Sequence, residues 1–205
     1  MGTGNCNFGF NLGQPQIELK SEEWRYLFGG GDTLARIKET CLNFALQGFR
    51  FRSICWRILL QCLPVDLSKW PAVLSDSRSQ YDALRKQYII DPREDEVQSA
   101  ERNWKTCNPL SLAADNPWQQ YFCDRELRAF IQQDVERTFP ELEYFQSPEV
   151  RRMMTEILFV YGRQNPHIAY KQGMHEILGP LLFVLYIDEQ AFEHILANTK
   201  STDAT

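Results

Sequence analysis

An aspartate and an arginine three residues apart lie near the end of one predicted helix. The segment 124–140 begins at Asp124, a residue type that caps helix N-termini, and stops at Pro140, which cannot continue a helix. At about 100° per residue, its inner face contains Leu127, Phe130, Ile131, Val135 and Thr138. Asp134 falls inside this face and Arg137 at its edge, where a long side chain can reach outward. Alone, the two residues are most simply an i,i+3 ion pair worth about 0.2–0.5 kcal/mol.

A second polar group precedes another predicted helix. Tyr170, Gln172 and Gly173 lie where a loop runs into an apolar segment. Gln172 is at the junction itself, and Gly173 permits a ligand or a partner to approach the backbone closely. A structural tyrosine followed by a polar turn explains this short motif about as well as a binding site does.

The elements that must position these residues are all predicted to be helical, and no strand-like alternation competes with the helical period. Caps, glycine runs and prolines predict helices over 21–28, 32–48, 53–63, 68–88, 124–140, 148–163 and 172–187, the last interrupted at Gly179-Pro180. The predicted fold class is therefore all-α, an irregular multi-helix domain held together by helix-on-helix packing.

The segment 53–63 is apolar nearly all round, a pattern typical of a helix at the centre of a core. Trp56 is most simply a core anchor of this helix. Arg52, at its start, is a charge that needs a partner.

Composition excludes several function classes. The chain has 205 residues, 43% hydrophobic and 24% charged, with a net charge of −5 that argues against nucleic acid as a partner. The six cysteines and three histidines show no metal-ligand spacing, so we expect reduced thiols, no metal site and a cytoplasmic protein. The longest apolar run, 181–187, is too short to span a membrane.

Three segments lack a helical period. Residues 1–20 are predicted to be a flexible tail, 91–116 a long loop, and 198–205 a polar tail. Pro109 and Leu110 lie in the long loop, where apolar side chains gain nothing from solvation. Two interpretations stay open, a loop that folds back onto the domain and a loop that binds a partner.

Taken together, the motifs resemble those of the TBC domain family of Rab GTPase-activating proteins. The resemblance spans roughly residues 21–195 and rests on Ile131-x-x-Asp134-x-x-Arg137, Tyr170-x-Gln172 and Arg52-Ser-Ile-Cys-Trp56. Further matching runs are Asn108-Pro-Leu-Ser111, Asp134-Val-x-Arg-Thr-Phe-Pro140 and Tyr170-Lys-Gln-Gly-Met-His-Glu176.

The resemblance implies a GTPase activator rather than a free-standing enzyme. Arg137 would be an arginine finger for the Rab-bound nucleotide, and Gln172 a glutamine finger for the attacking water. Asp134 and Tyr170 would hold the two fingers. The other residues implied to support the site or to bind the Rab are Ile131, Gly173, Arg52 and Trp56. The chain would need no cofactor of its own, since the Rab brings GTP and magnesium.

The resemblance also implies a place of action, peripheral to endosomal or autophagosomal membranes, with a late-endosomal Rab as a candidate partner. The alternative is a non-catalytic helical module that binds an endosomal coat such as retromer through residues 108–112. Residues 21–197 would form the N-terminal two-thirds of a TBC domain. We therefore expect a C-terminally truncated domain that is marginally stable alone.

Overall fold

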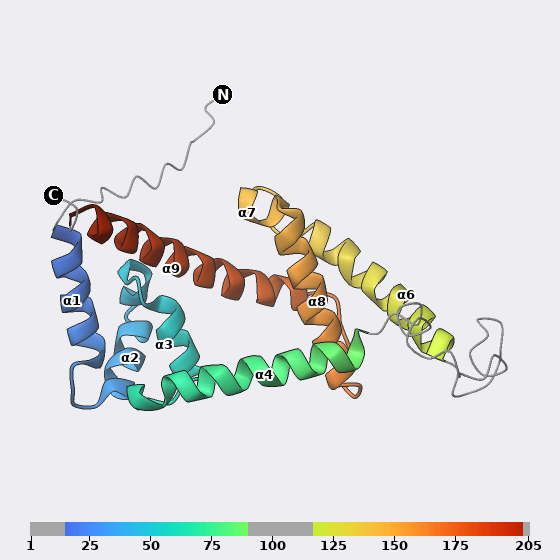
Figure 1. Ribbon diagram of the computed structural model, residues 1–205, viewed down its shortest axis with the longest axis horizontal. Helices are drawn as coiled ribbons and strands as arrows, with labels where there is room; N and C mark the ends of the chain where they lie inside the picture. The colour runs from blue at the N-terminus through green and yellow to red at the C-terminus, as the bar shows by residue number, and fades with distance from the viewer. Residues whose placement is uncertain (1–14, 90–116, 203–205) are drawn as a thin grey trace, which may run out of the picture. The chain divides into compact units, whose positions relative to one another are not determined.

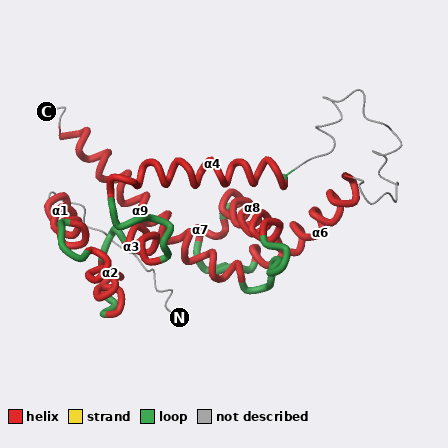
Figure 2. Tube along the Cα trace, turned by 90° about the horizontal axis from the view of Figure 1, so that it is seen from below, coloured by secondary structure: helices red, strands yellow, loops and turns green. Residues whose placement is uncertain are grey.

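The computed structural model describes residues 15–89 and 117–202 of the chain. Within these ranges it contains helices and loops and no strand, so the all-α prediction is confirmed (Figures 1 and 2). The α-helices are α1 (Pro15–Phe28), α2 (Thr33–Leu42), α3 (Arg52–Leu59), α4 (Trp70–Tyr88), α6 (Pro117–Glu136), α7 (Glu143–Gln146), α8 (Pro148–Gln164) and α9 (Met174–Thr202). Short 3₁₀ helices occupy Ala45–Gly48 and Leu67–Lys69. The predicted loop 91–116, with Pro109 and Leu110, lies outside the described residues.

The start of α6 differs from the prediction. The helix begins at Pro117, so Asp124 is an interior residue and not a cap. A proline suits the first helical position because that residue's N–H needs no partner there. Asp124 is 8% exposed, accepts a hydrogen bond from Gln120 (2.7 Å) and pairs with Arg163 (3.4 Å). Its carboxylate therefore stabilises the packing of α6 against α8.

Other helix boundaries also differ. The helix predicted over 32–48 is α2 followed by a separate 3₁₀ helix at Ala45–Gly48, and α3 ends at Leu59 and not at residue 63. The first helix begins at Pro15, six residues before the predicted Ser21 cap, so residues 15–20 of the expected tail are helical. Ser68, predicted as a cap, lies inside the 3₁₀ helix Leu67–Lys69 that precedes α4, and the N-cap of that short helix is Asp66, which accepts the Ser68 backbone N–H at 3.0 Å. The last helix, α9, is continuous through Pro180 and reaches Thr202, so the interruption expected at Gly179-Pro180 is wrong.

The continuity of α9 has a local explanation. Pro180 is exposed, so its ring lies on the solvent side and costs the helix one backbone hydrogen bond without disturbing the core. Gly179 is buried, and a Cβ added there would lie 2.7 Å from the Phe139 ring. The glycine is thus required by close packing and does not mark a break.

Contacts divide the chain into two compact units, which we describe separately. Unit 2 comprises Pro71–Phe183. Within it α6 packs against α8, and the short α7 packs against the same helix (Figure 1, yellow to orange). The buried side chains of its core are Ile131, Val135, Phe145, Val150, Met154, Leu158, Phe159, Val160 and Tyr170. This core fixes the end of α6, where the candidate site lies.

Unit 1 comprises Met1–Trp70 and Val184–Thr205. Cys55 and Ile58 of α3 are buried in it, whereas Trp56 is only partly buried, so the anchors of α3 are these smaller residues.

The first residue of α3, Arg52, is also partly buried, and its charge acts on the Asp188 carboxylate. Asp188 is 4% exposed and accepts the Ser53 N–H at 2.8 Å. It therefore caps α3 from a distant part of the chain, since Phe51 at the N-cap has no side chain that can accept this bond.

We expect Asp188→Asn to stabilise the protein near neutral pH. Burial raises the pKa of the Asp188 carboxyl, although the Ser53 hydrogen bonds oppose the shift. A carboxyl whose pKa is raised in the folded state lowers the stability of the protein as pH rises through that pKa, because the buried group must then become charged. The asparagine oxygen can still accept the Ser53 N–H. The variant should melt above the wild type at pH 7, and the difference should shrink as pH falls towards about 4.

Thermal melts at a series of pH values check this expectation, with the exposed Asp76→Asn as the matched control. A lower melting temperature for Asp188→Asn at pH 7 would show that α3 and Arg52 need the full negative charge.

Candidate functional site

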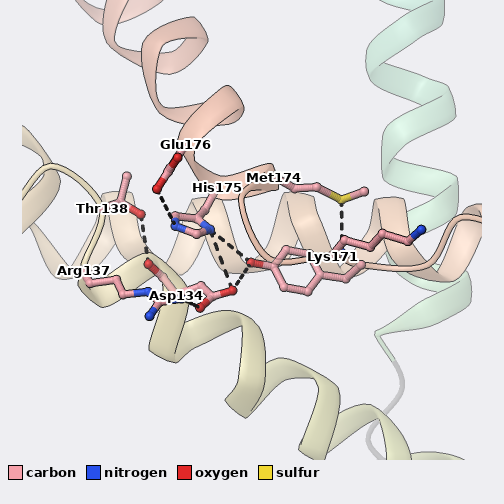
Figure 3. Close-up of polar contacts among 8 residues, drawn as sticks. Asp134, Arg137, Thr138, Lys171, Met174, His175 and Glu176 are labelled. Atoms are coloured by element: carbon pink, nitrogen blue, oxygen red, sulfur yellow. Dashed lines mark hydrogen bonds and ion pairs between the residues drawn. The ribbon is translucent and has the colours of Figure 1, made fainter.

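The candidate site is organised around the carboxylate of Asp134, in the last turn of α6. The residue is 3% exposed, and its two oxygens have different partners. Oδ1 accepts a hydrogen bond from Nη2 of Arg137, and Oδ2 accepts one from the Tyr170 hydroxyl at 2.8 Å (Figure 3). A buried carboxylate is costly unless such donors satisfy it. The contacts therefore join the end of α6 to the loop that precedes α9.

Arg137 lies immediately after the last residue of α6. The chain turns there: Thr138 donates its N–H to Val135 at 3.1 Å, and Phe139 has a φ of 41°, outside helical geometry as Pro140 predicts. The Arg137 side chain is 56% exposed, whereas that of Asp134 is 4% exposed. A guanidinium has five N–H donors in a planar fork. One edge is thus held by a buried carboxylate, and donors remain for an anionic ligand.

Tyr170 is fixed by close packing on two sides. A Cβ added to Gly162 of α8 would lie 3.3 Å from the backbone nitrogen of Tyr170, so the glycine allows this approach. The Phe130 ring meets the Tyr170 ring edge-on, with centroids 5.9 Å apart. Burial, and next the hydrogen bond and charge of Asp134, raise the pKa of Tyr170 above its ordinary value. The hydroxyl therefore remains a proton donor to Asp134 at neutral pH.

Gln172 and Gly173 complete the loop before α9. Gln172 is exposed, and within the part of the chain that the structure describes its side-chain amide has no hydrogen-bond partner. Gly173 has a φ of 97°, which L-residues rarely adopt. The backbone closes with Met174 N–H to Lys171 O at 3.2 Å and Glu176 N–H to Gly173 O at 3.1 Å. The loop thus presents an exposed amide two residues from Tyr170.

Comparisons with known proteins identify the family of the chain. The model of the Rab-GTPase-TBC domain family matches residues 49–200. The chain belongs to this family. It is 41% identical over 173 residues to TBC1 domain family member 5 of Mus musculus and 42% identical to that of Homo sapiens, in both cases over 84% of this chain and 21% of the relative. TBC1 domain family member 5 homolog B of Dictyostelium discoideum is 32% identical over 92% of this chain and 18% of its own length.

The chain therefore spans about a fifth of the length of these curated relatives. No solved structure matches it significantly. In the described ranges, no group of three or more His, Cys, Asp or Glu side chains could hold a metal ion. No helix in those ranges is both long and apolar enough to cross a membrane.

The structure of this TBC domain places the predicted site residues in three groups. Asp134 is in direct contact with both Arg137 and Tyr170, and Gln172 and Gly173 lie on the same loop as Tyr170. Ile131 is fully buried in the core of unit 2 and supports α6 from inside. Arg52 and Trp56 belong to unit 1. Pro109 and Leu110 lie outside the described residues.

The sequence prediction missed one residue of the TBC site, His175 in the first turn of α9. It is 2% exposed, and its Nδ1 lies 3.3 Å from the Tyr170 hydroxyl oxygen and 3.8 Å from Asp134 Oδ2 (Figure 3). The available signal was a polar ring at the start of an otherwise apolar helix. That signal does not reveal burial, because a residue in a first turn is often exposed.

We expect Gly173→Ala to destabilise this TBC domain by about 1 kcal/mol or more. An added Cβ would meet nothing within 4 Å, so the cost arises from the positive φ alone. Denaturant unfolding measures the effect. Gly48→Ala is the matched control, because Gly48 also has open space for a Cβ but no positive φ. Equal stability of the two variants would show that the loop relaxes to a φ that alanine accepts.

Proposed function

We propose that this TBC domain activates GTP hydrolysis by Rab-family small GTPases, with Arg137 as an arginine finger and Gln172 as a glutamine finger. The observation that carries the proposal is the state of Arg137: more than half of its side chain is exposed, and one edge is held by a buried carboxylate. A surface arginine without such a support would lose more rotamer freedom on binding.

The chemistry of the two side chains supports this assignment. A GTPase alone is slow because the charge that develops on the γ-phosphate oxygens is poorly compensated and the water poorly placed. A guanidinium is always charged and matches phosphate geometry bidentately. A glutamine amide both donates and accepts hydrogen bonds, so it can orient a water molecule without changing the charge of the site.

The remaining residues have supporting roles in this proposal. Asp134 and Tyr170 orient Arg137 and take no part in the chemistry. Arg52 and Trp56 contribute to Rab binding. GTP and magnesium arrive with the Rab, so the chain uses no cofactor of its own. Action at endosomal or autophagosomal membranes, on a late-endosomal Rab, is part of the proposal, and so is a cytoplasmic location.

A single-turnover assay tests the proposal. GTP-loaded Rabs from a panel are mixed with an excess of the chain, and both hydrolysis and direct binding are measured. We expect at least one Rab to be hydrolysed faster with the chain than alone. Binding without acceleration would overturn the proposal and favour the non-catalytic interaction module, for which retromer contact through residues 108–112 is the predicted mode.

A further inference from the structure

We propose that His175 is a positioning residue for Arg137, acting through Tyr170 and Asp134. The inference rests on the proposed function of Arg137. Its basis is that His175, in the first turn of α9, is 2% exposed and its ring lies next to Asp134 (Figure 3). Its Nδ1 is 3.3 Å from the Tyr170 oxygen and 3.8 Å from Asp134 Oδ2. The ring is thus the innermost member of a chain of polar contacts that ends at the exposed guanidinium.

The number of protons fixes the direction of these contacts. The Tyr170 hydroxyl has one proton, and it donates that proton to Asp134, the closer partner at 2.8 Å. The Nδ1 of His175 must then be a donor towards the tyrosine oxygen, because two lone pairs would otherwise face each other. His175 therefore has its proton on Nδ1. The order of donation is His175 to Tyr170, Tyr170 to Asp134, and Arg137 to the other oxygen of Asp134.

Because of this order of donation, the strength of the hydrogen bond from Tyr170 to Asp134 depends on His175. A ring with an unprotonated Nδ1 would compete with Asp134 for the single hydroxyl proton of Tyr170. A side chain with no nitrogen there would leave the tyrosine oxygen without its donor in a buried place. In both cases Tyr170 would hold Asp134 less firmly, and Arg137 would lose orientation. Among the described residues, the charged group close to the other ring nitrogen is Glu176, 71% exposed, whose Oε1 is 3.9 Å from Nε2.

Two substitutions at His175 separate positioning from simple packing. His175→Leu removes the donor, whereas His175→Asn keeps a nitrogen donor on Cγ at the same distance along the side chain as Nδ1. We expect His175→Leu to lower the single-turnover rate at saturating chain concentration roughly tenfold, the equivalent of one lost hydrogen bond. The chain concentration that gives half the maximal rate should stay unchanged. His175→Asn should restore most of the rate.

A purely structural role would give a different pattern. It would shift the half-saturating concentration and the melting temperature together with the rate, and His175→Asn, which leaves a smaller side chain in the buried site, would not restore them. A wild-type rate in a folded His175→Leu protein would also overturn the proposal.

Nuclear magnetic resonance tests the same proposal without any Rab. The ¹⁵N shifts of His175 in the wild-type chain should show a protonated Nδ1 and an unprotonated Nε2, or two protonated nitrogens. The Nε–H signal of Arg137 should shift or broaden in His175→Leu and keep its wild-type position in His175→Asn. A proton on Nε2 alone, or an Arg137 signal that is the same in both variants, would overturn the inference. If no Rab is accelerated, the proposed function fails, and these signals still decide whether His175 positions Arg137.

Discussion

Replacing Arg137 with lysine should lower the acceleration of Rab-bound GTP hydrolysis by about 10³-fold or more, as should Arg137→Ala, since an arginine finger is worth roughly 10³–10⁵ in rate. The lysine variant is the sharper test because it keeps the positive charge. A lysine ammonium is a point donor on a flexible stem, so it cannot contact Asp134 and present a planar fork to phosphate oxygens at the same time. Direct binding of GTP-loaded Rab should change little, because the interaction matters in the transition state.

The controls for Arg137 are in the same molecule. Arg125 is another exposed arginine, earlier on α6, and Arg125→Ala should keep the wild-type rate. Arg137→Ala removes a donor from buried Asp134, so its melting temperature must be measured with its rate. A folded Arg137→Lys protein with wild-type acceleration would remove Arg137 from the proposed mechanism without affecting the fold.

The sequence predicts part of the site by helix geometry alone. Residues three apart are neighbours on any helix, so the contact between Asp134 and Arg137 follows from their spacing. The burial of Asp134 follows from its place inside an apolar face. The contact of Tyr170 with the same carboxylate does not follow, because it crosses from the loop before α9 to α6 and depends on tertiary packing. The resemblance to a family implied only that both residues hold the fingers, and the structure added their direct contact and His175.

Helix boundaries were harder to predict than helix types. The cap residue Asp124 has the right chemistry for a helix start, but Pro117 is the actual first residue of α6, and Asp124 instead pairs with Arg163 of α8. In α9 the sequence Gly179-Pro180 predicts a break in the helix. The helix nevertheless continues, because Gly179 packs closely against Phe139. In both cases a tertiary contact outweighed a local preference, and tertiary contacts cannot be predicted from sequence periodicity.

Because of Asp134, the side chain of Arg137 is held by hydrogen bonding within the domain, whereas that of Gln172, the other proposed finger, has no such contact in the described part of the chain. Arg137 is held by a buried residue that itself has a second donor, whereas Gln172 is exposed and has no side-chain partner among the described residues. The position of Gln172 is set by its backbone, through Tyr170 on one side and the positive φ of Gly173 on the other. In the proposed mechanism, Arg137 would therefore be oriented before a Rab binds, and the amide of Gln172 would become ordered only in the complex.

We therefore expect substitutions at Gln172 to reduce activity without reducing stability. Gln172→Ala should lower the single-turnover rate by roughly 10²-fold, the usual cost of a misplaced reactant, while the melting temperature stays within about a degree of the wild type. Gln172→Asn should also be slow, because its amide is one methylene shorter and falls short of the water. Gln172→Glu should be at least as slow as Gln172→Ala, since a carboxylate cannot donate and repels the γ-phosphate.

The matched control is Gln119→Ala, which removes another exposed glutamine of unit 2 and should keep the wild-type rate. The rates at saturating chain concentration and the melting temperatures of all four variants decide the matter. A Gln172→Glu protein as active as the wild type would show that water is oriented by another group, such as the Rab's own glutamine. A large loss of melting temperature in Gln172→Ala would mean instead that the amide supports the loop before α9 rather than the reaction.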